Sequence, residues 1–294
     1  MTAGTGVYTS RGLAHDLRAV GLRTGDVVLV HSSLRRIGPT EQGAATVVEA
    51  LRTAVGTEGT IVVPTFTAAN SLSSPVHRER VRGMTAQEVD AYREAMPGFD
   101  ATTTPSTGMG AVAELVRTTP GARRSTHPQT SLAALGPLAD VITRDHPLDC
   151  LLGEDSPLGH LCRLDARILL LGVGFESCTA FHLGEYRSSD PSVRRYDCVV
   201  ADGRRADGQP GRRWLSFEDV ALDDRDFGRL GAWLEHRRTD TGRGVVRRGR
   251  VGAGIARLLP MAHSVDLAVE WFKEHRTAGG GSTGDRIPLT RPPG

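Results

Sequence analysis

The sequence predicts an α/β protein in which a layered sheet is flanked by helices, and three observations support this. Residues 168–171 are a continuous apolar run typical of a buried strand. They are followed by a turn at Gly172 and Gly174 and by a helix-compatible segment over residues 179–187. Two earlier segments repeat the order helix, short turn, strand. The 294 residues are 39% hydrophobic and 24% charged, which suits a globular protein with a full core.

Apolar periodicity and turn signals divide the chain into further elements. Helices are predicted over residues 10–20, 43–55, 84–95, 111–117, 137–143, 158–162 and 264–275, and residues 217–238 are expected to be helical in part. Strands are predicted over residues 27–30, 60–63, 131–135, 168–171 and 193–200, and polar loops over residues 31–35, 68–83 and 102–106. Ser10 and Ser156 are the predicted helix caps, and Ser156 is followed by Pro157 at the first helical turn.

The chain changes character after residue 190. Arg-rich strands and turns predict a β-containing C-terminal lobe over residues 190–260, within a single domain over residues 1–277. Its Arg doublets have no interleaved aromatic residues, so they indicate a solvated strand edge and not an RNA-binding surface. Residues 278–294 are rich in Gly, Pro and Thr and are predicted to be disordered.

Composition bounds the partners and the location of the protein. The net charge of +2 gives no case for nucleic acid or a membrane as partner. No run of about 18 apolar residues and no N-terminal signal pattern is present, so a cytoplasmic protein is expected. The four cysteines show no CxxC spacing and no nearby His cluster, so no metal site is predicted and free thiols are expected.

The segment after the central strand carries a candidate general base. His182 and Glu185 are three residues apart, which places both side chains on one face of a helix. The glutamate can orient the imidazole and raise its basicity. The alternative is an ordinary pair on a surface helix.

Two segments could hold an anionic ligand. The first lies just past a buried strand, where α/β proteins often bind ligands, although it could also be a simple Ser-rich strand exit. It consists of His31, Ser32, Ser33, Leu34 and Arg35. The second places small residues before a helix N-terminus, which favours anions, but it lacks the pattern of a P-loop or a dinucleotide site. It consists of Ser106, Thr107, Gly108, Met109 and Gly110.

An acidic segment precedes the helix at Ser156. Asp149, Glu154 and Asp155 could form an anionic rim that attracts a cationic substrate, or could serve only to cap and solvate the helix start. His127, which precedes Pro128, is expected to form hydrogen bonds within a loop.

Taken in order, these segments resemble the aminoglycoside 3-N-acetyltransferase family, which is unrelated to the GNAT fold. The matching stretches are GDVVLVHSSLRRIG, GTIVVPTFT, PSTGMGAVAELVRTTPGARRSTHPQTSLAALGP, LLGEDSPLGHL, CTAFHLGEYR and VGAGIARLLPMAHSVDLAVEWF. The resemblance covers about residues 10–275. It implies acetyl-CoA-dependent acetylation of the 3-amino group of a 2-deoxystreptamine aminoglycoside, and hence antibiotic resistance.

The resemblance also implies roles for individual residues. The family pattern T-x-x-H-x-x-E matches Thr179, His182 and Glu185 as the catalytic residues. The two candidate anion segments match the family's loops that contact CoA. The GEDSPL stretch looks like the loop near the acceptor, so Asp149, Glu154 and Asp155 would hold its ammonium groups. Cys150, Leu151 and Leu152 depart there from the family's small and aromatic residues.

The expected chemistry is direct transfer without a covalent enzyme intermediate. His182 would remove the proton of the attacking amine, and backbone N–H groups around Ser32 and Ser33 would bind the tetrahedral oxyanion. Three alternatives remain: an acyltransferase for another amine, such as an amino sugar or a biosynthetic intermediate, a hydrolase using Cys178 with His182, and a non-catalytic binding module. The sequence is compatible with a monomer or a homodimer.

Overall fold

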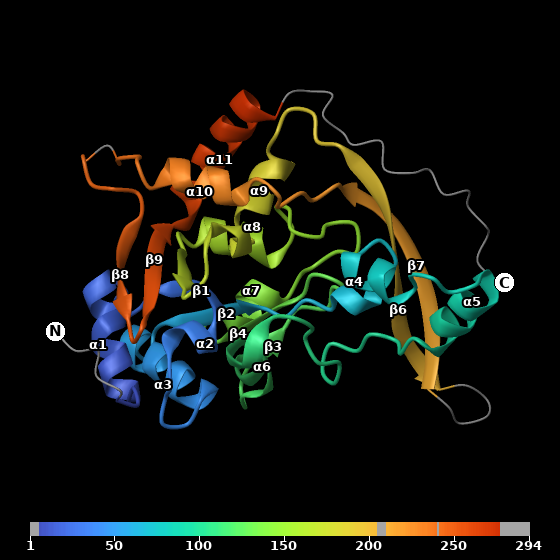
Figure 1. The fold of residues 1–294 in the computed structure, drawn as a ribbon, viewed down its shortest axis with the longest axis horizontal. Helices are drawn as coiled ribbons and strands as arrows, with labels where there is room; N and C mark the ends of the chain where they lie inside the picture. Colours follow the sequence, from blue (N-terminus) through green and yellow to red (C-terminus); the bar gives the residue numbers. More distant parts are fainter. Residues whose placement is uncertain (1–5, 205–209, 240, 277–294) are drawn as a thin grey trace.

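The computed structural model describes residues 6–204, 210–239 and 241–276, and its centre is a seven-stranded sheet with the order β3-β4-β2-β1-β5-β9-β8 (Figure 1). The three central strands run parallel, and the strands on either side pair antiparallel. The central strands are β1 (Val27–Ser32), β2 (Thr60–Pro64) and β5 (Arg167–Leu171). The outer strands are β3 (Arg123–Arg124), β4 (Leu132–Leu135), β8 (Arg247–Val251) and β9 (Gly254–Pro260).

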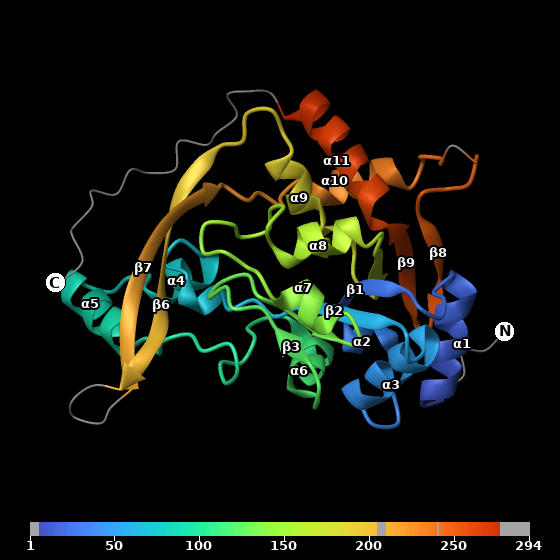
Figure 2. The ribbon, with the colours of Figure 1, turned by 180° about the vertical axis from the view of Figure 1, so that it is seen from behind.

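Helices cover both faces of this sheet (Figures 1 and 2). Side chains alternate between the faces of a strand, so Val28 and Val30 of β1 join one core cluster while Val27 and Leu29 join the other. The first face carries α1 (Ser10–Val20), α3 (Ala44–Val55) and α6 (Gly110–Thr118). The second face carries α7 (Ala139–Thr143), α8 (Pro157–Arg163), α9 (Phe181–Tyr186), α10 (Phe227–Leu234) and α11 (Met261–His275).

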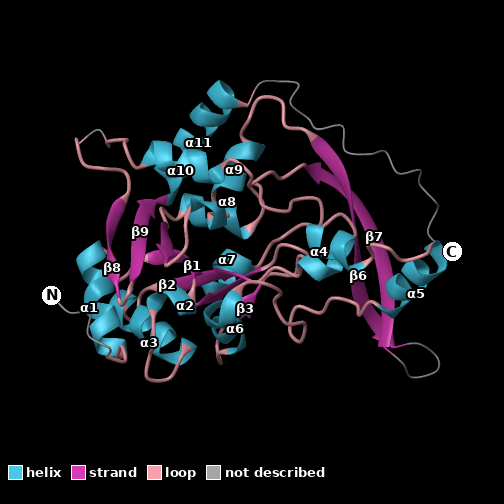
Figure 3. Ribbon diagram, viewed as in Figure 1, coloured by secondary structure: helices cyan, strands magenta, loops and turns pink. Residues whose placement is uncertain are grey.

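A separate two-stranded ribbon, β6 (Val193–Arg204) and β7 (Pro210–Val220), extends beside the sheet (Figure 3). A 3-10 turn at Ala68–Asn70 and the helices α4 (Pro75–Arg80) and α5 (Ala86–Ala95) lie toward the ribbon. The side chain of Asn70 joins the 3-10 turn to β6, because its Nδ2 donates to the Val199 carbonyl at 2.7 Å and its Oδ1 accepts from the Val199 N–H at 2.8 Å.

The structure confirms the α/β class and most predicted elements, and it corrects several local predictions. The cap of α1 is Thr9 and not Ser10, because the Thr9 hydroxyl accepts the N–H of Gly12 at 3.0 Å. Residues 31–35 are not a loop, since β1 continues through Ser32 and a short helix, α2 (Leu34–Ile37), follows. Residues 68–83 are not simply an exposed loop, because they form the 3-10 turn and α4 and bury several polar side chains.

The predicted β-containing lobe over residues 190–260 is divided between two sheets. β6 and β7 form the separate ribbon, whereas β8 and β9 continue the main sheet, since β9 pairs along the whole of β5. The lobe is therefore limited to the ribbon. The tail predicted over residues 278–294 lies outside the described residues.

Two buried histidines hold the loop that precedes α8. The rings of His127 and His146 lie 4.7 Å apart. Their Nε2 atoms donate to the carbonyls of Leu148 at 3.0 Å and Leu151 at 2.9 Å, and their Nδ1 atoms accept hydrogen bonds. Burial lowers the pKa of His127 to about 3 and that of His146 to about 4. His127 is thus the loop hydrogen-bonder that the sequence predicts.

The helix α10 approaches the core through a glycine. A Cβ added at Gly231 would lie 1.9 Å from Cγ of Phe175, so helix and ring touch without a side chain between them. Phe227 of the same helix packs edge-on against Phe181 of α9, with ring centroids 5.4 Å apart. The close approach of α10 to Phe175 therefore helps to fix the contact between Phe227 and Phe181 of α9.

We expect acid to destabilise the fold through His127 and His146. Both histidines are neutral in the folded protein, but in the unfolded chain each binds a proton below about pH 6.5. The free energy of unfolding is therefore highest above pH 6.5 and falls as the pH drops toward 4. Each histidine costs up to about 1.4 kcal/mol per pH unit, roughly 3 kcal/mol in all between pH 6.5 and 5. Urea unfolding across this range measures the slope. Replacement of the exposed His15 should leave it unchanged, and an unaltered slope in a folded His127→Asn/His146→Asn variant would contradict the assignment.

We expect Gly231→Ala to destabilise the protein by roughly 1–3 kcal/mol, because the new methyl group must displace Phe175. Gly228→Ala is the matched control, since Gly228 lies on the same helix and has no atom within 4 Å of its added Cβ. There the alanine should stabilise the helix by up to about 1 kcal/mol. Thermal unfolding of both variants provides the comparison, and equal effects would rule out the close approach as the cause.

Candidate active site

The predicted pair forms a buried dyad at the end of the central sheet. β5 leads through a 3-10 turn, Phe175–Ser177, into α9, which carries His182 and Glu185 one turn apart. Nδ1 of His182 lies 2.7 Å from Oε2 of Glu185, and the two side chains are only 12% and 5% exposed. A carboxylate can only accept, so Nδ1 carries the proton and Nε2 is left as a proton acceptor.

The end of β1 lies beside this dyad. β1 pairs parallel to β5, with Ser32 opposite Leu171. The alternation that places Val27 and Leu29 on the face covered by α8 to α11 places His31 on that face too. The side chain of His31 is almost completely buried, and its Nε2 has no hydrogen-bond partner among the described residues. Burial, with a smaller effect of the nearby His182, lowers the pKa of His31 to about 4, so the ring is neutral.

The second predicted cofactor segment meets β1 from the opposite face. A Cβ on Gly110, the first residue of α6, would lie 3.8 Å from the Ser32 carbonyl oxygen. Gly108 and Gly110 adopt φ values of 75° and 85°, a left-handed conformation that favours glycine. Ser106 is tied into α6, since its N–H and hydroxyl donate to Oε2 of Glu114 at 3.0 and 2.7 Å. The structure thus brings residues 31–35 and 106–110 together.

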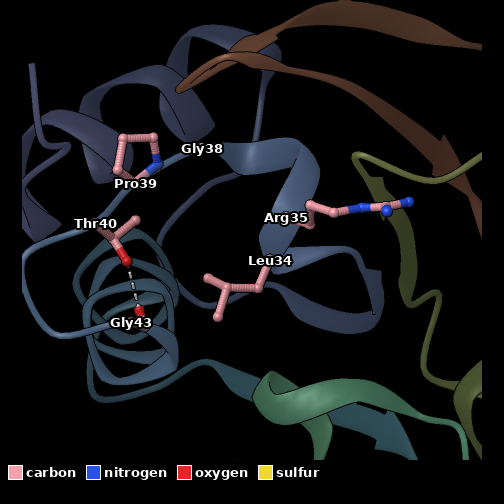
Figure 4. A pocket seen from close by; sticks show the side chains of 6 residues that line it. All are labelled: Leu34, Arg35, Gly38, Pro39, Thr40 and Gly43. Atoms are coloured by element: carbon pink, nitrogen blue, oxygen red, sulfur yellow. Dashed lines mark hydrogen bonds between the residues drawn. The ribbon is translucent and has the colours of Figure 1, made fainter. Parts of the chain in front are cut away.

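A shallow open hollow of about 480 Å³ adjoins the first segment (Figure 4). In the close-up, the Arg35 side chain extends away from Thr40, whose hydroxyl donates to the Gly43 carbonyl at 2.8 Å. The N–H groups at the start of α2 have no acceptor within the helix, as at any helix N-terminus. The lining residues are Leu34, Arg35, Gly38, Pro39, Thr40 and Gly43.

One predicted oxyanion donor is already engaged. The N–H of Ser33 donates to the Leu171 carbonyl at 2.9 Å and so extends the β1–β5 pairing by one bond. It cannot serve an oxyanion in this arrangement. The prediction that Ser33 contributes such a donor is corrected accordingly.

The three predicted acceptor carboxylates, Asp149, Glu154 and Asp155, are exposed but not equivalent. Oε1 of Glu154 accepts from Nε of Arg187 at 2.7 Å, and its other oxygen lies 3.8 Å from Arg163, so Glu154 ties α8 to the end of α9. Asp149 and Asp155 have no ion pair among those found in the described residues.

The segment that the resemblance predicts to differ from the family, residues 150–152, lies mostly in the core. Both leucines are fully buried, and the N–H of Leu151 donates to the buried carboxylate of Asp219 on β7 at 2.5 Å. Their apolar side chains therefore stabilise the loop from inside.

Sequence reasoning missed the groups that hold the other oxygen of Glu185. Oε1 accepts from Nη1 of Arg276 at 2.5 Å and from the N–H of Asp223 at 3.1 Å. Arg276 also donates two hydrogen bonds to Asp226. The sequence signal for Arg276 is a cation directly after the last helix. Cations at that position commonly serve only to stabilise the helix C-terminus, so the signal does not point to Glu185.

Two residues just before the dyad are also predicted to take part in chemistry: Thr179 by the resemblance, and Cys178 in the hydrolase alternative. The carbonyl of Thr179 accepts the N–H of His182 at 3.1 Å and so helps to start α9. Cys178 is completely buried, and burial raises the pKa of its thiol to about 12. A thiol with such a pKa supplies almost no thiolate at neutral pH, which argues against the cysteine hydrolase alternative.

Within residues 6–204, 210–239 and 241–276, no helix has the length and apolar character needed to cross a membrane. The same residues contain no group of three or more His, Cys, Asp or Glu side chains suited to a metal ion.

Comparison with known proteins identifies the family. A sequence model of the aminoglycoside 3-N-acetyltransferase family matches residues 29–273. A relative from Bacillus subtilis (strain 168), the SPbeta prophage-derived aminoglycoside N(3')-acetyltransferase-like protein YokD, is 36% identical over 267 residues, which is 90% of this chain and 92% of the relative.

Solved structures agree with the sequence match. The crystal structure of the Bacillus subtilis protein superposes with a TM-score of 0.82 at 34% identity, over 92% of this chain and 96% of that one. A structure of AAC-IIIb with CoASH gives a TM-score of 0.75 at 29% identity, and AAC-VIa bound to sisomicin gives 0.74 at 28%; each match covers 92% of this chain, with 97% and 98% of the other chain covered. These matches confirm the resemblance that the ordered motifs predict. The chain belongs to the aminoglycoside 3-N-acetyltransferase family of acyltransferases.

Proposed function

We propose that this protein transfers the acetyl group of acetyl-CoA directly to the 3-amino group of 2-deoxystreptamine aminoglycosides, with His182 as general base. The observation that carries the proposal is the 2.7 Å hydrogen bond between His182 and Glu185, which lies beside His31 at the end of β1. Family membership supports the reaction class and the acceptor.

The dyad suits the chemistry of an attacking amine. An amine attacks a thioester only after its proton has been removed, and Nε2 of His182 is the nitrogen left free to accept it. Glu185 fixes the tautomer and stabilises the imidazolium that forms. A positioned general base contributes on the order of 10²–10⁴-fold in rate.

The cofactor segments offer a suitable cradle for acetyl-CoA. The glycines at 108 and 110 allow a ligand to approach the backbone closely, and the start of α6 favours an anion. Arg35 borders the hollow beside α2, where its guanidinium can pair with a phosphate. The neutral imidazole of His31, with an unpartnered Nε2, gives this region a polar group without a charge. The related AAC-IIIb with bound CoASH supports this use of the fold.

The acceptor is a polycation, and exposed carboxylates suit it. Asp149 and Asp155 are the remaining candidates to pair with its other ammonium groups, because Glu154 is engaged with Arg187. The related AAC-VIa, which has been solved bound to sisomicin, supports an aminoglycoside as the ligand. The same proposal includes resistance to these antibiotics as the consequence of acetylation, and the cytoplasm as the place where the protein acts.

We expect His182→Ala to lower kcat by about 10²–10⁴-fold while acetyl-CoA still binds, because only the proton acceptor is lost. Glu185→Gln should lower kcat less, since the imidazole remains. Thiol release from acetyl-CoA with gentamicin, tobramycin and kanamycin measures turnover, and calorimetry measures binding. His15→Ala, on the exposed side of α1, is the control. Normal turnover in His182→Ala would exclude His182 as the base. If the wild type binds acetyl-CoA but releases no thiol with any of these aminoglycosides, an acyltransferase for another amine would be favoured.

We expect Arg35→Gln to weaken CoA binding roughly tenfold at low salt and to reduce its salt dependence, because a charge-assisted phosphate contact is lost. Arg52→Gln on α3 is the matched control, as it removes the same exposed charge away from the hollow. Titration of both variants with CoA at two ionic strengths decides the point. Equal affinities for the two variants would move the phosphate site elsewhere.

A further inference from the structure

The final described residue of the chain reaches back to the dyad. Arg276 follows α11 directly and lies 91 residues beyond Glu185, and past the residues 29–273 that match the family. Its Nη1 donates to Oε1 of Glu185 at 2.5 Å, while the other oxygen of that carboxylate holds His182. The guanidinium and the imidazole therefore share one buried carboxylate.

Arg276 is itself held on several sides. Nε and Nη2 donate to the two carboxylate oxygens of Asp226 at 2.8 and 2.5 Å, and Nη2 also donates to the Asp223 carbonyl at 2.6 Å. Its guanidinium carbon lies 3.9 Å from the ring centroid of Phe272. Burial disfavours the charge, but the hydrogen bonds to Asp226 and Glu185 outweigh it and raise the pKa of Arg276, which stays cationic.

The start of α10 also contacts the imidazole of His182. Phe227 follows Asp226 directly, and its ring centroid lies 4.8 Å from that of His182. Arg276 thus joins the end of α11, the loop before α10 and the catalytic carboxylate into one assembly. A lysine could not span Asp226 and Glu185 in this way, because it lacks the planar fork.

The charges around α9 come from several elements. From β1, the neutral His31 faces the dyad. From the loop before α10 come Asp223, which pairs with the exposed Arg225, and Asp226, which pairs with Arg276. At the far end of α9, Arg187 pairs with Glu154 and with Asp266 of α11. Arg276 is the cation in direct contact with Glu185 among the described residues.

We propose that Arg276 is a positioning residue for the His182–Glu185 pair, which fixes the orientation of the Glu185 carboxylate and offsets part of its negative charge. Without this cation, the Glu185 carboxylate would stabilise the imidazolium form of His182 more strongly. This inference rests on the proposed role of His182 as the base.

The test compares pH profiles of the wild type, Arg276→Gln and Arg225→Gln. In Arg276→Gln, loss of the cation should move the acidic limb of kcat/KM to higher pH by about one unit. The NMR titration of the His182 ring without substrate should move by the same amount, and the affinity for CoA should not change. Arg225→Gln removes an equal charge that lies one contact farther from the dyad and is exposed, so its profile should match the wild type.

The outcomes separate this inference from the proposed function. If the wild-type acidic limb persists in His182→Gln, the base assignment fails whatever Arg276 does. If His182 accounts for the limb but Arg276→Gln leaves both the limb and the NMR titration in place, the role of Arg276 is overturned. An equal shift in Arg225→Gln would also overturn it, because the effect would then be general electrostatics.

A further variant covers the case in which Arg276→Gln does not fold. Arg276→Lys retains the charge and can pack over Phe272, but it cannot hold Asp226 and Glu185 together. We expect a wild-type acidic limb with kcat lowered several-fold. A wild-type kcat in Arg276→Lys would show that the fork does not position Glu185.

Discussion

The pairing of β1 with β5 is the constraint on which the site depends. It runs from Val28 opposite Arg167 to Ser32 opposite Leu171, so two strands far apart in sequence end side by side. The parallel arrangement places the segments that follow both strands at one edge, where open α/β sheets bind ligands. Side-chain alternation then sends His31 toward α9 and Ser32 toward α6. The proposed base and residues 106–110 thus approach the end of β1 from its two faces.

Burial of the Glu185 carboxylate is a second constraint. A buried charge is costly unless it is paired and hydrogen-bonded, and this side chain is 5% exposed. Its partners come from three places: His182 on its own helix, the backbone of Asp223, and Arg276 after α11. The geometry of the His182–Glu185 pair is therefore part of the tertiary packing and is not supplied by α9 alone.

Polar bonds also fix the proposed acceptor region. The carboxylate of Asp219 on β7 accepts from the N–H of Leu151 and from the hydroxyl of Tyr186, each at 2.5 Å, and Tyr186 directly follows Glu185 on α9. The ribbon, the loop before α8 and α9 are joined at this point. Buried networks of this kind specify one arrangement when every member is satisfied. They explain how an extended ribbon can keep a defined relation to the dyad.

The sequence by itself determined the features of the fold and the site that depend on residues close together in the chain. Apolar runs marked β1, β2 and β5, and the three-residue spacing of His182 and Glu185 placed both on one helical face, since these signals arise from local backbone periodicity. The tertiary structure decided that β8 and β9 join the main sheet, that the N–H of Ser33 is consumed by strand pairing, and that Arg276 returns to Glu185. No local pattern encodes these contacts, because each depends on which distant segment the folded chain brings alongside.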